Sequence, residues 1–294
     1  MYAVSTDFEE YFIKEQEKYP QLELEDVQKL RECLAKEKKL PLISDKKIVA
    51  FLHSSYFDLE LAKTTIVKTY KNYYDVPEIF CHLDPTTPDM IKNNDCVSLG
   101  DLTYDKTGSD VRYLYMQFKD NDPENYEFFP SVKIVVMWME YVLLCYGTFD
   151  DLIVVINCDG LQWRHVVKIP LGILTKLIKF IQGGLPLRLK AVHFVNTGSA
   201  MKKLIKMVSP FIDKPLMNKL KFHSVGSQNI FNYVPKELLP EEIGGSGKCH
   251  TFYSDEIYKN IVLCRDYFID HSETLQKQME INKQKSKKKS SKIV

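Results

Sequence analysis

The sequence carries almost no net charge, and this excludes one broad class of function. Its 40 Lys and Arg residues are balanced by 39 Asp and Glu residues, which leaves a formal net charge of +1. A protein that binds nucleic acid must neutralise many phosphates and usually has a strongly basic composition. Nucleic acid is therefore not predicted as a partner.

Signals for export, membrane insertion and disulfide formation are also missing. The seven cysteines are odd in number and form no C-x-x-C pair, and Cys145 and Cys158 lie in apolar runs, where a free cysteine behaves as a small hydrophobic residue. The start of the chain lacks the basic and apolar regions of a signal peptide. No stretch approaches the roughly 18 consecutive apolar residues of a membrane-spanning helix. A reduced protein of the cytosol is expected.

The motifs of common enzymes are absent as well. There is no G-x-S-x-G elbow, and the seven histidines never fall at the H-x-x-x-H spacing of a metal site. The segment GGSGK at Gly244–Lys248 resembles half of a phosphate-binding loop. However, Glu242 stands where the loop needs its first glycine, and Cys249 stands where it needs Ser or Thr. No catalytic residue, metal or cofactor is predicted.

The length and hydrophobic pattern indicate one large core with a helical N-terminal part. At 294 residues, of which 45% are hydrophobic, the chain can bury a single large core and a small helical annex. Helical spacing of Leu24, Val27, Leu30 and Leu34 is followed by two further apolar faces before residue 80. Asp58 is the expected N-cap of the third of these helices.

The rest of the chain alternates between strand and helix patterns. Residues 77–110 are rich in Pro, Asp and Asn and are interpreted as a connection with a short helix. The expected strands are Val111–Phe118, Leu152–Cys158, Ala191–Asn196 and Leu220–Val225. The expected helices are Ser131–Tyr146, Pro170–Ile181, Met201–Val208 and Asp255–Gln276. Such alternation predicts an α/β sheet with parallel strands.

Three motifs resemble those of a known family. They are FDLELA at Phe57–Ala62, PFI at Pro210–Ile212 and LPEEIGG at Leu239–Gly245. With them, residues from about 25 to 270 resemble the CRAL-TRIO family of Sec14-like lipid-binding proteins, and most closely its tocopherol-transfer and retinaldehyde-binding branch, which is expanded in insects. The residues HSS at 53–55 replace the basic residues that usually precede the first motif, so one family contact with anionic lipid is not expected here.

The resemblance implies a fold and its boundaries. A helical subdomain is expected at residues 1–80, and a CRAL-TRIO α/β domain with a mixed, largely parallel sheet at residues 81–250. A C-terminal helix is expected at residues 251–280, followed by a disordered, Lys-rich tail at residues 281–294. That tail has two open interpretations, a solubilising end and a contact to membrane.

The segment Pro170–Pro186 has an apolar face and ends its helical pattern at Gly183 and Gly184. By periodicity alone it is a core-facing helix, whereas the resemblance implies a mobile gate helix that covers a lipid cavity. The implied ligand-binding residues are Val132, Val135, Val136, Met139, Leu143, Ile153, Val155, Leu174, Leu177, Ile178, Ile181, Leu185, Val192 and Phe194. Any α/β protein needs such residues for its core, so their pattern alone does not separate the two interpretations.

Two of these residues bear on the kind of ligand. Val135 and Met139 stand where the tocopherol branch has serines near its ligand, which implies a ligand with little polar decoration.

Four basic residues form a second candidate site. Arg188 and Lys190 are two apart on an extended segment and so point the same way, while Lys214 and Lys219 flank the turn before the next strand. The resemblance implies that they hold phosphoinositide phosphates outside the gate. The residues alone favour an ordinary solvated surface.

The resemblance implies a non-enzymatic, cytoplasmic carrier. It would bind a small hydrophobic ligand, such as a tocopherol, retinoid or carotenoid, in a closed apolar cavity. It would transfer this ligand between membranes, docking peripherally and transiently on anionic or phosphoinositide lipid. The alternative is a lipid-sensing regulatory module that controls a protein partner without net transport. A transfer assay separates the two, because a sensor binds lipid without accelerating its transfer.

Overall fold

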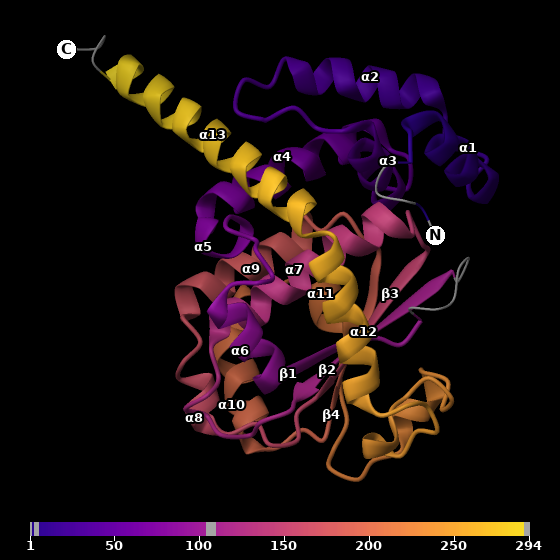
Figure 1. Cartoon of the computed structure of the whole chain (residues 1–294), viewed down its shortest axis with the longest axis vertical. Coiled ribbons are helices and arrows are strands. Elements are labelled where there is room, and N and C mark those ends of the chain that lie inside the picture. Colours follow the sequence, from indigo (N-terminus) through magenta and orange to yellow (C-terminus); the bar gives the residue numbers. More distant parts are fainter. Residues whose placement is uncertain (1, 3–5, 104–109, 291–294) are drawn as a thin grey trace.

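Four helices form the N-terminal part of the chain. The computed structural model describes residues 2, 6–103 and 110–290, with the backbone alone for residues 286–290. Its first elements are α1 (Phe8–Lys18), α2 (Leu24–Ala35), α3 (Asp45–Ser54) and α4 (Leu59–Asp75). The expected N-cap is present, since the Asp58 carboxylate accepts a hydrogen bond of 2.9 Å from the backbone N–H of Leu61. The four helices gather at one end of the molecule (Figure 1).

The segment that follows these helices has more regular structure than the sequence indicated. It holds α5 (Pro77–Phe80), α6 (Pro88–Cys96) and a strand, β1 (Val97–Asp101). The expectation of a connection with one short helix was therefore wrong. The strand VSLGD has few strand-forming residues, and tertiary contacts fix it. Gly100 lies so close to a later helix that an added Cβ would come within 2.6 Å of the Tyr253 Cβ.

Five strands form one sheet in the order β1-β2-β3-β4-β5. The remaining strands are β2 (Val111–Phe118), β3 (Asp151–Asn157), β4 (Leu189–Val195) and β5 (Leu220–Phe222). β1 runs antiparallel to β2, and β2 to β5 are parallel. The predicted α/β class with a mixed, largely parallel sheet is confirmed.

Helices connect the parallel strands, as this topology requires. They are α7 (Phe128–Cys145), α8 (Trp163–Val166), α9 (Leu171–Gly183), α10 (Ser199–Val208) and α11 (Lys214–Lys219), with a 3₁₀ turn η1 (Ser209–Phe211). Within the described part of the chain, only α7 is long and apolar enough to cross a membrane. Because 67% of it is buried against the rest of the fold, its composition is that of a core helix.

The second face of the sheet is closed by the segment between β5 and α12 (His250–Leu263). This segment contains η2 (Asn229–Asn232) and η3 (Glu241–Ile243). In the LPEEIGG motif, Gly244 has φ of 83°, and an added Cβ on Gly245 would lie 1.9 Å from the Leu239 carbonyl oxygen. The motif therefore has a structural role, because its tight turn places the buried Leu239 against the sheet.

The C-terminus forms a second helix, α13 (Arg265–Ser290), which begins after a break at Cys264. The sequence analysis predicted a single helix at Asp255–Gln276, whereas the structure has two, α12 and α13. The long helix passes α4 (Figure 1), and its Asn282 donates a hydrogen bond of 3.0 Å to the Lys39 carbonyl in the loop between α2 and α3. It continues to Ser290, although a disordered tail was expected from residue 281. Residues 291–294 lie outside the described residues.

Candidate functional site

An apolar cavity of about 380 Å³ lies between the sheet and the helices α7, α9 and α10. All 28 side chains that line it are apolar. The indole N–H of Trp138 is already bound, because it donates to Oδ2 of Asp101 at 3.4 Å. The lining therefore offers a ligand dispersion contacts and burial of apolar surface, but no side-chain hydrogen bond.

Most of the predicted ligand-binding residues lie together on this cavity. The eleven that line it are Val132, Val135, Val136, Met139, Leu174, Leu177, Ile178, Ile181, Leu185, Val192 and Phe194. The other three, on β3 and near the end of α7, lie elsewhere.

The prediction chose the wrong face of β3. Val154 and Ile156 line the cavity, whereas Ile153 and Val155 lie on the opposite face in a core with Leu239. Side chains alternate along a strand, so an error of one residue exchanges the faces. Because both faces of β3 are covered, the run LIVVI at residues 152–156 is apolar throughout and does not indicate which residues face the cavity.

Leu143 lies on the predicted face of α7, but it lies beyond the end of the cavity. Val132, Val135, Val136 and Met139 follow helical spacing and line the cavity wall. Leu143 lies about one turn further along, a distance of roughly 5.4 Å. There it lines a second pocket instead.

The helix α9 covers the cavity and is anchored at its C-terminal end. The Thr69 hydroxyl on α4 donates a buried hydrogen bond of 2.6 Å to the Gly184 carbonyl. A Cβ on Gly184 would lie 3.2 Å from the Thr69 Cα, so the close approach of the two backbones favours glycine. The opposite end is looser: Leu171 is 37% exposed, and a Cβ on Gly172 would meet nothing within 4 Å.

The sequence analysis missed the contribution of α10. Met201, Leu204, Ile205 and Val208 line the cavity, and their spacing is that of one helical stripe. The helix had been expected at these positions, and this spacing was the signal that could have assigned its face. The opposite side of α10 carries three exposed lysines (Lys202, Lys203 and Lys206).

Arg188 does not lie free on the surface. Its Nε donates to the His53 carbonyl at 2.9 Å, Nη1 lies 3.5 Å from Oδ1 of Asp150, and the guanidinium lies 4.3 Å from the Tyr56 ring centroid. Its side chain is only 14% exposed. Arg188 therefore joins β4 to the N-terminal helices. Its phosphate-binding role stays a prediction, although Nε and Nη1 already have partners within the protein.

The other three predicted basic residues differ in availability. The Lys219 ammonium donates to the Leu189 carbonyl, and Lys190 forms an ion pair with Asp151. Lys214 is exposed, and no carboxylate within the described residues pairs with it. The structure does not bring the four together as one free cluster.

Positive charge is nevertheless concentrated in the segment of the sequence that contains these residues. Residues 161–229 contain twelve Lys and Arg residues against one acidic residue, Asp213. That carboxylate is occupied as the N-cap of α11, where it accepts from the Leu216 N–H at 2.8 Å. Over the described residues, Lys202, Lys203 and Lys206 have no ion pair. A count of charge by segment would have found this asymmetry, which the near-neutral total conceals.

Comparison with known proteins identifies the family. Residues 100–245 match the CRAL/TRIO domain. The chain belongs to the CRAL-TRIO family. Residues 19–90 match the Pinta-like UBA domain, which corresponds to α2, α3, α4 and the segment up to α6. Proteins of the CRAL-TRIO family bind lipophilic ligands and transfer them, and they are generally not enzymes.

Individual relatives are distant but cover most of the chain. The α-tocopherol transfer protein-like protein of Mus musculus is 26% identical over 238 residues, which span 79% of this chain and 68% of the relative. Its Homo sapiens counterpart is 25% identical over 241 residues, with the same coverage. Among solved structures, the crystal structure of Sfh5 has a TM-score of 0.47 and 14% identity, over 80% of this chain and 92% of that one.

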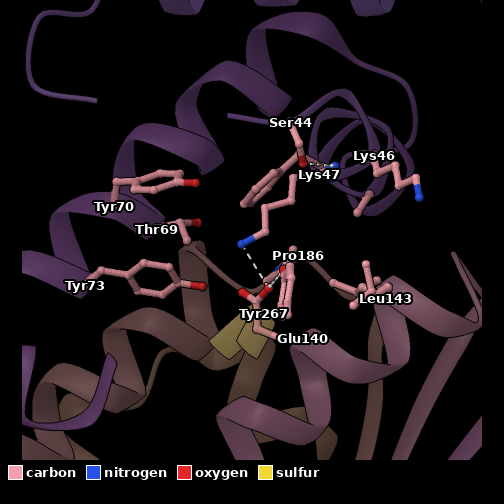
Figure 2. A pocket seen from close by; sticks show the side chains of 13 residues that line it. Ser44, Lys46, Lys47, Thr69, Tyr70, Tyr73, Glu140, Leu143, Pro186 and Tyr267 are labelled. Carbon is pink, nitrogen blue, oxygen red and sulfur yellow. Dashed lines mark hydrogen bonds and ion pairs between the residues drawn. The ribbon is translucent and has the colours of Figure 1, made fainter. Parts of the chain in front are cut away.

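A polar cluster lies beside α7, beyond the end of the cavity, where the CRAL/TRIO domain meets the N-terminal helices and α13 (Figure 2). Lys47 Nζ lies 2.9 Å from Oε2 of the buried Glu140, and the Tyr267 hydroxyl donates to the same oxygen at 2.8 Å. Burial alone would raise the pKa of Glu140, but Lys47, with His271 and Tyr267, outweighs it and holds the value at about 2. The cluster is a buried ion pair that joins three parts of the fold.

Proposed function

We propose that this CRAL-TRIO protein is a carrier that holds a small hydrophobic ligand in the cavity behind α9 and transfers it between membranes. The observation that carries the proposal is a cavity of about 380 Å³ whose 28 lining side chains are all apolar. Each CH₂ group that enters such a cavity from water gains about 0.8 kcal/mol. A bilayer offers nearly the same gain, so the ligand can move between cavity and membrane without being trapped.

The helix α9 supports a loading route in this proposal. It is amphipathic, it lines the cavity with Leu174, Leu177 and Ile178, and its C-terminal end is anchored at Gly184. We propose that its looser N-terminal end moves outward at a membrane surface. The apolar face of the helix would then meet acyl chains, and the cavity would open toward the bilayer.

Docking is proposed to use the basic side of the CRAL/TRIO domain. The support is the excess of basic residues over residues 161–229 and the exposed lysines at 202, 203 and 206 on α10, a helix that also forms the cavity wall. Exposed Lys214 can add to this face, whereas Arg188 and Lys219 support the fold. The proposed membrane is anionic, including phosphoinositide lipid, and the contact is peripheral, transient and made from the cytoplasm.

The first test is to load the purified protein from a lipid mixture and identify what it retains by native mass spectrometry and solvent extraction. A stoichiometric apolar lipid, together with faster vesicle-to-vesicle transfer, is the result expected of a carrier. Stoichiometric lipid without faster transfer would favour the lipid-sensing regulatory module instead. A folded protein that retains nothing would refute both functions.

The variant Ile181→Asp is expected to reduce ligand transfer between vesicles by about tenfold or more, because a carboxylate on the apolar wall of the cavity is poorly compensated. Ile181 lines the cavity and is also 39% exposed, so the change should leave the fold intact. The matched control is Ile13→Asp on α1, where the isoleucine is 51% exposed and away from the cavity. Equal transfer rates for the two variants would show that α9 is not part of the loading route.

A further inference from the structure

The cavity walls lack free hydrogen-bonding side chains, and this determines which ligands the cavity binds. Over the described residues, none of its 28 lining side chains brings a free donor or acceptor. The nearest polar group, the indole N–H of Trp138, is turned to Asp101. Most lining residues belong to helices or to strands of the sheet, whose backbone groups are bonded within those elements, and Leu185, Leu187 and Ile212 lie in connecting segments. A polar group buried here finds no side-chain partner.

The absence of a partner has a predictable effect on binding. A hydroxyl that leaves water and finds no hydrogen bond in an apolar site weakens binding by about tenfold or more. The contour of the ligand matters less, because Met116, Met139 and Met201 can adapt to different hydrocarbon shapes. The cavity therefore selects on polarity more than on the shape of the chain.

We propose that the cargo is a lipid with an unsubstituted hydrocarbon chain and at most one polar group, at a chain end that reaches water at the exposed part of the cavity wall. The same chain with a hydroxyl in its interior is rejected, because that hydroxyl and the polar end cannot both reach water. This inference rests on the proposed carrier function. It adds the class of ligand and assigns specificity to the apolar wall formed by β3 and β4 residues such as Val154 and Val192.

The test compares oleic acid with ricinoleic acid, which differ by one mid-chain hydroxyl. Binding of each acid to the full chain is measured by native mass spectrometry and by displacement of a fluorescent fatty acid. Oleic acid is expected to bind at least about tenfold more tightly. In Val154→Thr, a nearly isosteric change on β3, the new hydroxyl gives ricinoleic acid a partner, so the ratio is expected to narrow.

The control variant is Val167→Thr, at a valine that is 61% exposed and does not line the cavity, and it should leave the ratio unchanged. Equal binding of the two acids to the wild-type protein would overturn the inference while the carrier function stands. If neither acid binds, the lipid retained from a membrane extract decides: an interior hydroxyl in it overturns the inference, and an unsubstituted chain supports it. Failure to retain any lipid would refute the carrier function itself.

Discussion

The triple variant Lys202→Glu, Lys203→Glu, Lys206→Glu is expected to lose at least about a hundredfold in its binding to anionic vesicles. Each lysine near an anionic leaflet contributes about 1 kcal/mol, and about 1.4 kcal/mol corresponds to a factor of ten. Loss of the three attractions alone gives this factor, and the three new repulsions add to it. Transfer to anionic acceptor vesicles should fall with binding, whereas transfer to neutral vesicles should change little.

Ligand affinity in the same variant is expected to stay at the wild-type value. The three lysines point away from the cavity, which is lined on α10 by Met201, Leu204, Ile205 and Val208. Vesicle co-sedimentation and ligand titration measure the two properties separately. Wild-type vesicle binding should also weaken with added salt, because exposed charges are screened beyond about 8 Å at physiological ionic strength.

A matched control tests whether the location of the charge matters. Lys36, Lys38 and Lys39 are three exposed lysines in the loop between α2 and α3, beside Lys285 of α13. Their replacement by glutamate makes the same change in net charge on a different surface. If this control loses vesicle binding and the α10 variant retains it, the docking surface is the Lys-rich end of α13 and not the cavity side.

The variant Lys47→Met is expected to lower the free energy of unfolding by about 3–5 kcal/mol, the usual cost of leaving one partner of a buried ion pair uncompensated. Glu140 is only 4% exposed, and Lys47 is the cation that lies closest to its carboxylate. Urea unfolding of wild type and variant measures the difference. The double variant Lys47→Met, Glu140→Leu should recover most of the loss, because it removes the buried charge as well.

The neighbouring Lys46→Met provides the control. Lys46 donates to the Thr6 carbonyl and lies 5.5 Å from the Tyr11 ring centroid, but among the described residues it pairs with no carboxylate. Its replacement should cost about 1 kcal/mol, the value of one hydrogen bond. A loss as large as that of Lys47→Met would show that packing of the lysine stems, and not the ion pair, stabilises this interface.

The same ion pair predicts a pH dependence. Glu140 has its pKa held at about 2, below its ordinary value of 4.5. Its contribution to stability is therefore complete above pH 4.5 and is lost as the pH falls from there to about 2. In Lys47→Met the pKa of the buried carboxyl should rise above its value in the unfolded chain, so this loss of stability at low pH should disappear. The difference in the free energy of unfolding between wild type and variant should therefore be smaller at about pH 3 than at about pH 7, and urea unfolding at the two pH values measures it.

The sequence predicted the cavity well where one side of an element is apolar and the other is polar. On α9, the lysines at 176 and 179 mark the outer face, and all four predicted residues of the helix line the cavity. On β3, apolar residues occupy both faces, and Ile153 and Val155 were assigned to the wrong one. Periodicity locates a face only when the other face differs from it in polarity.

The basic residues show a different limit of prediction from sequence. Arg188 was predicted to bind phosphate because its place in the chain matches a family motif. Its guanidinium instead contacts the His53 carbonyl, Asp150 and Tyr56, all of which lie far from it in sequence. By contrast, the excess of basic residues over 161–229 was visible in the sequence without any structure.

The sequence by itself determined the α/β class, the positions of the parallel strands along the chain, the helical N-terminal part and the membership suggested by LPEEIGG. These depend on local patterns of polarity and on short motifs, which act over a few residues. The tertiary structure alone decided the strand β1, the faces of β3, the partners of Arg188 and the Lys47–Glu140 pair across α3 and α7. Each of these depends on which distant segments come into contact, and no local pattern in the chain contains that information.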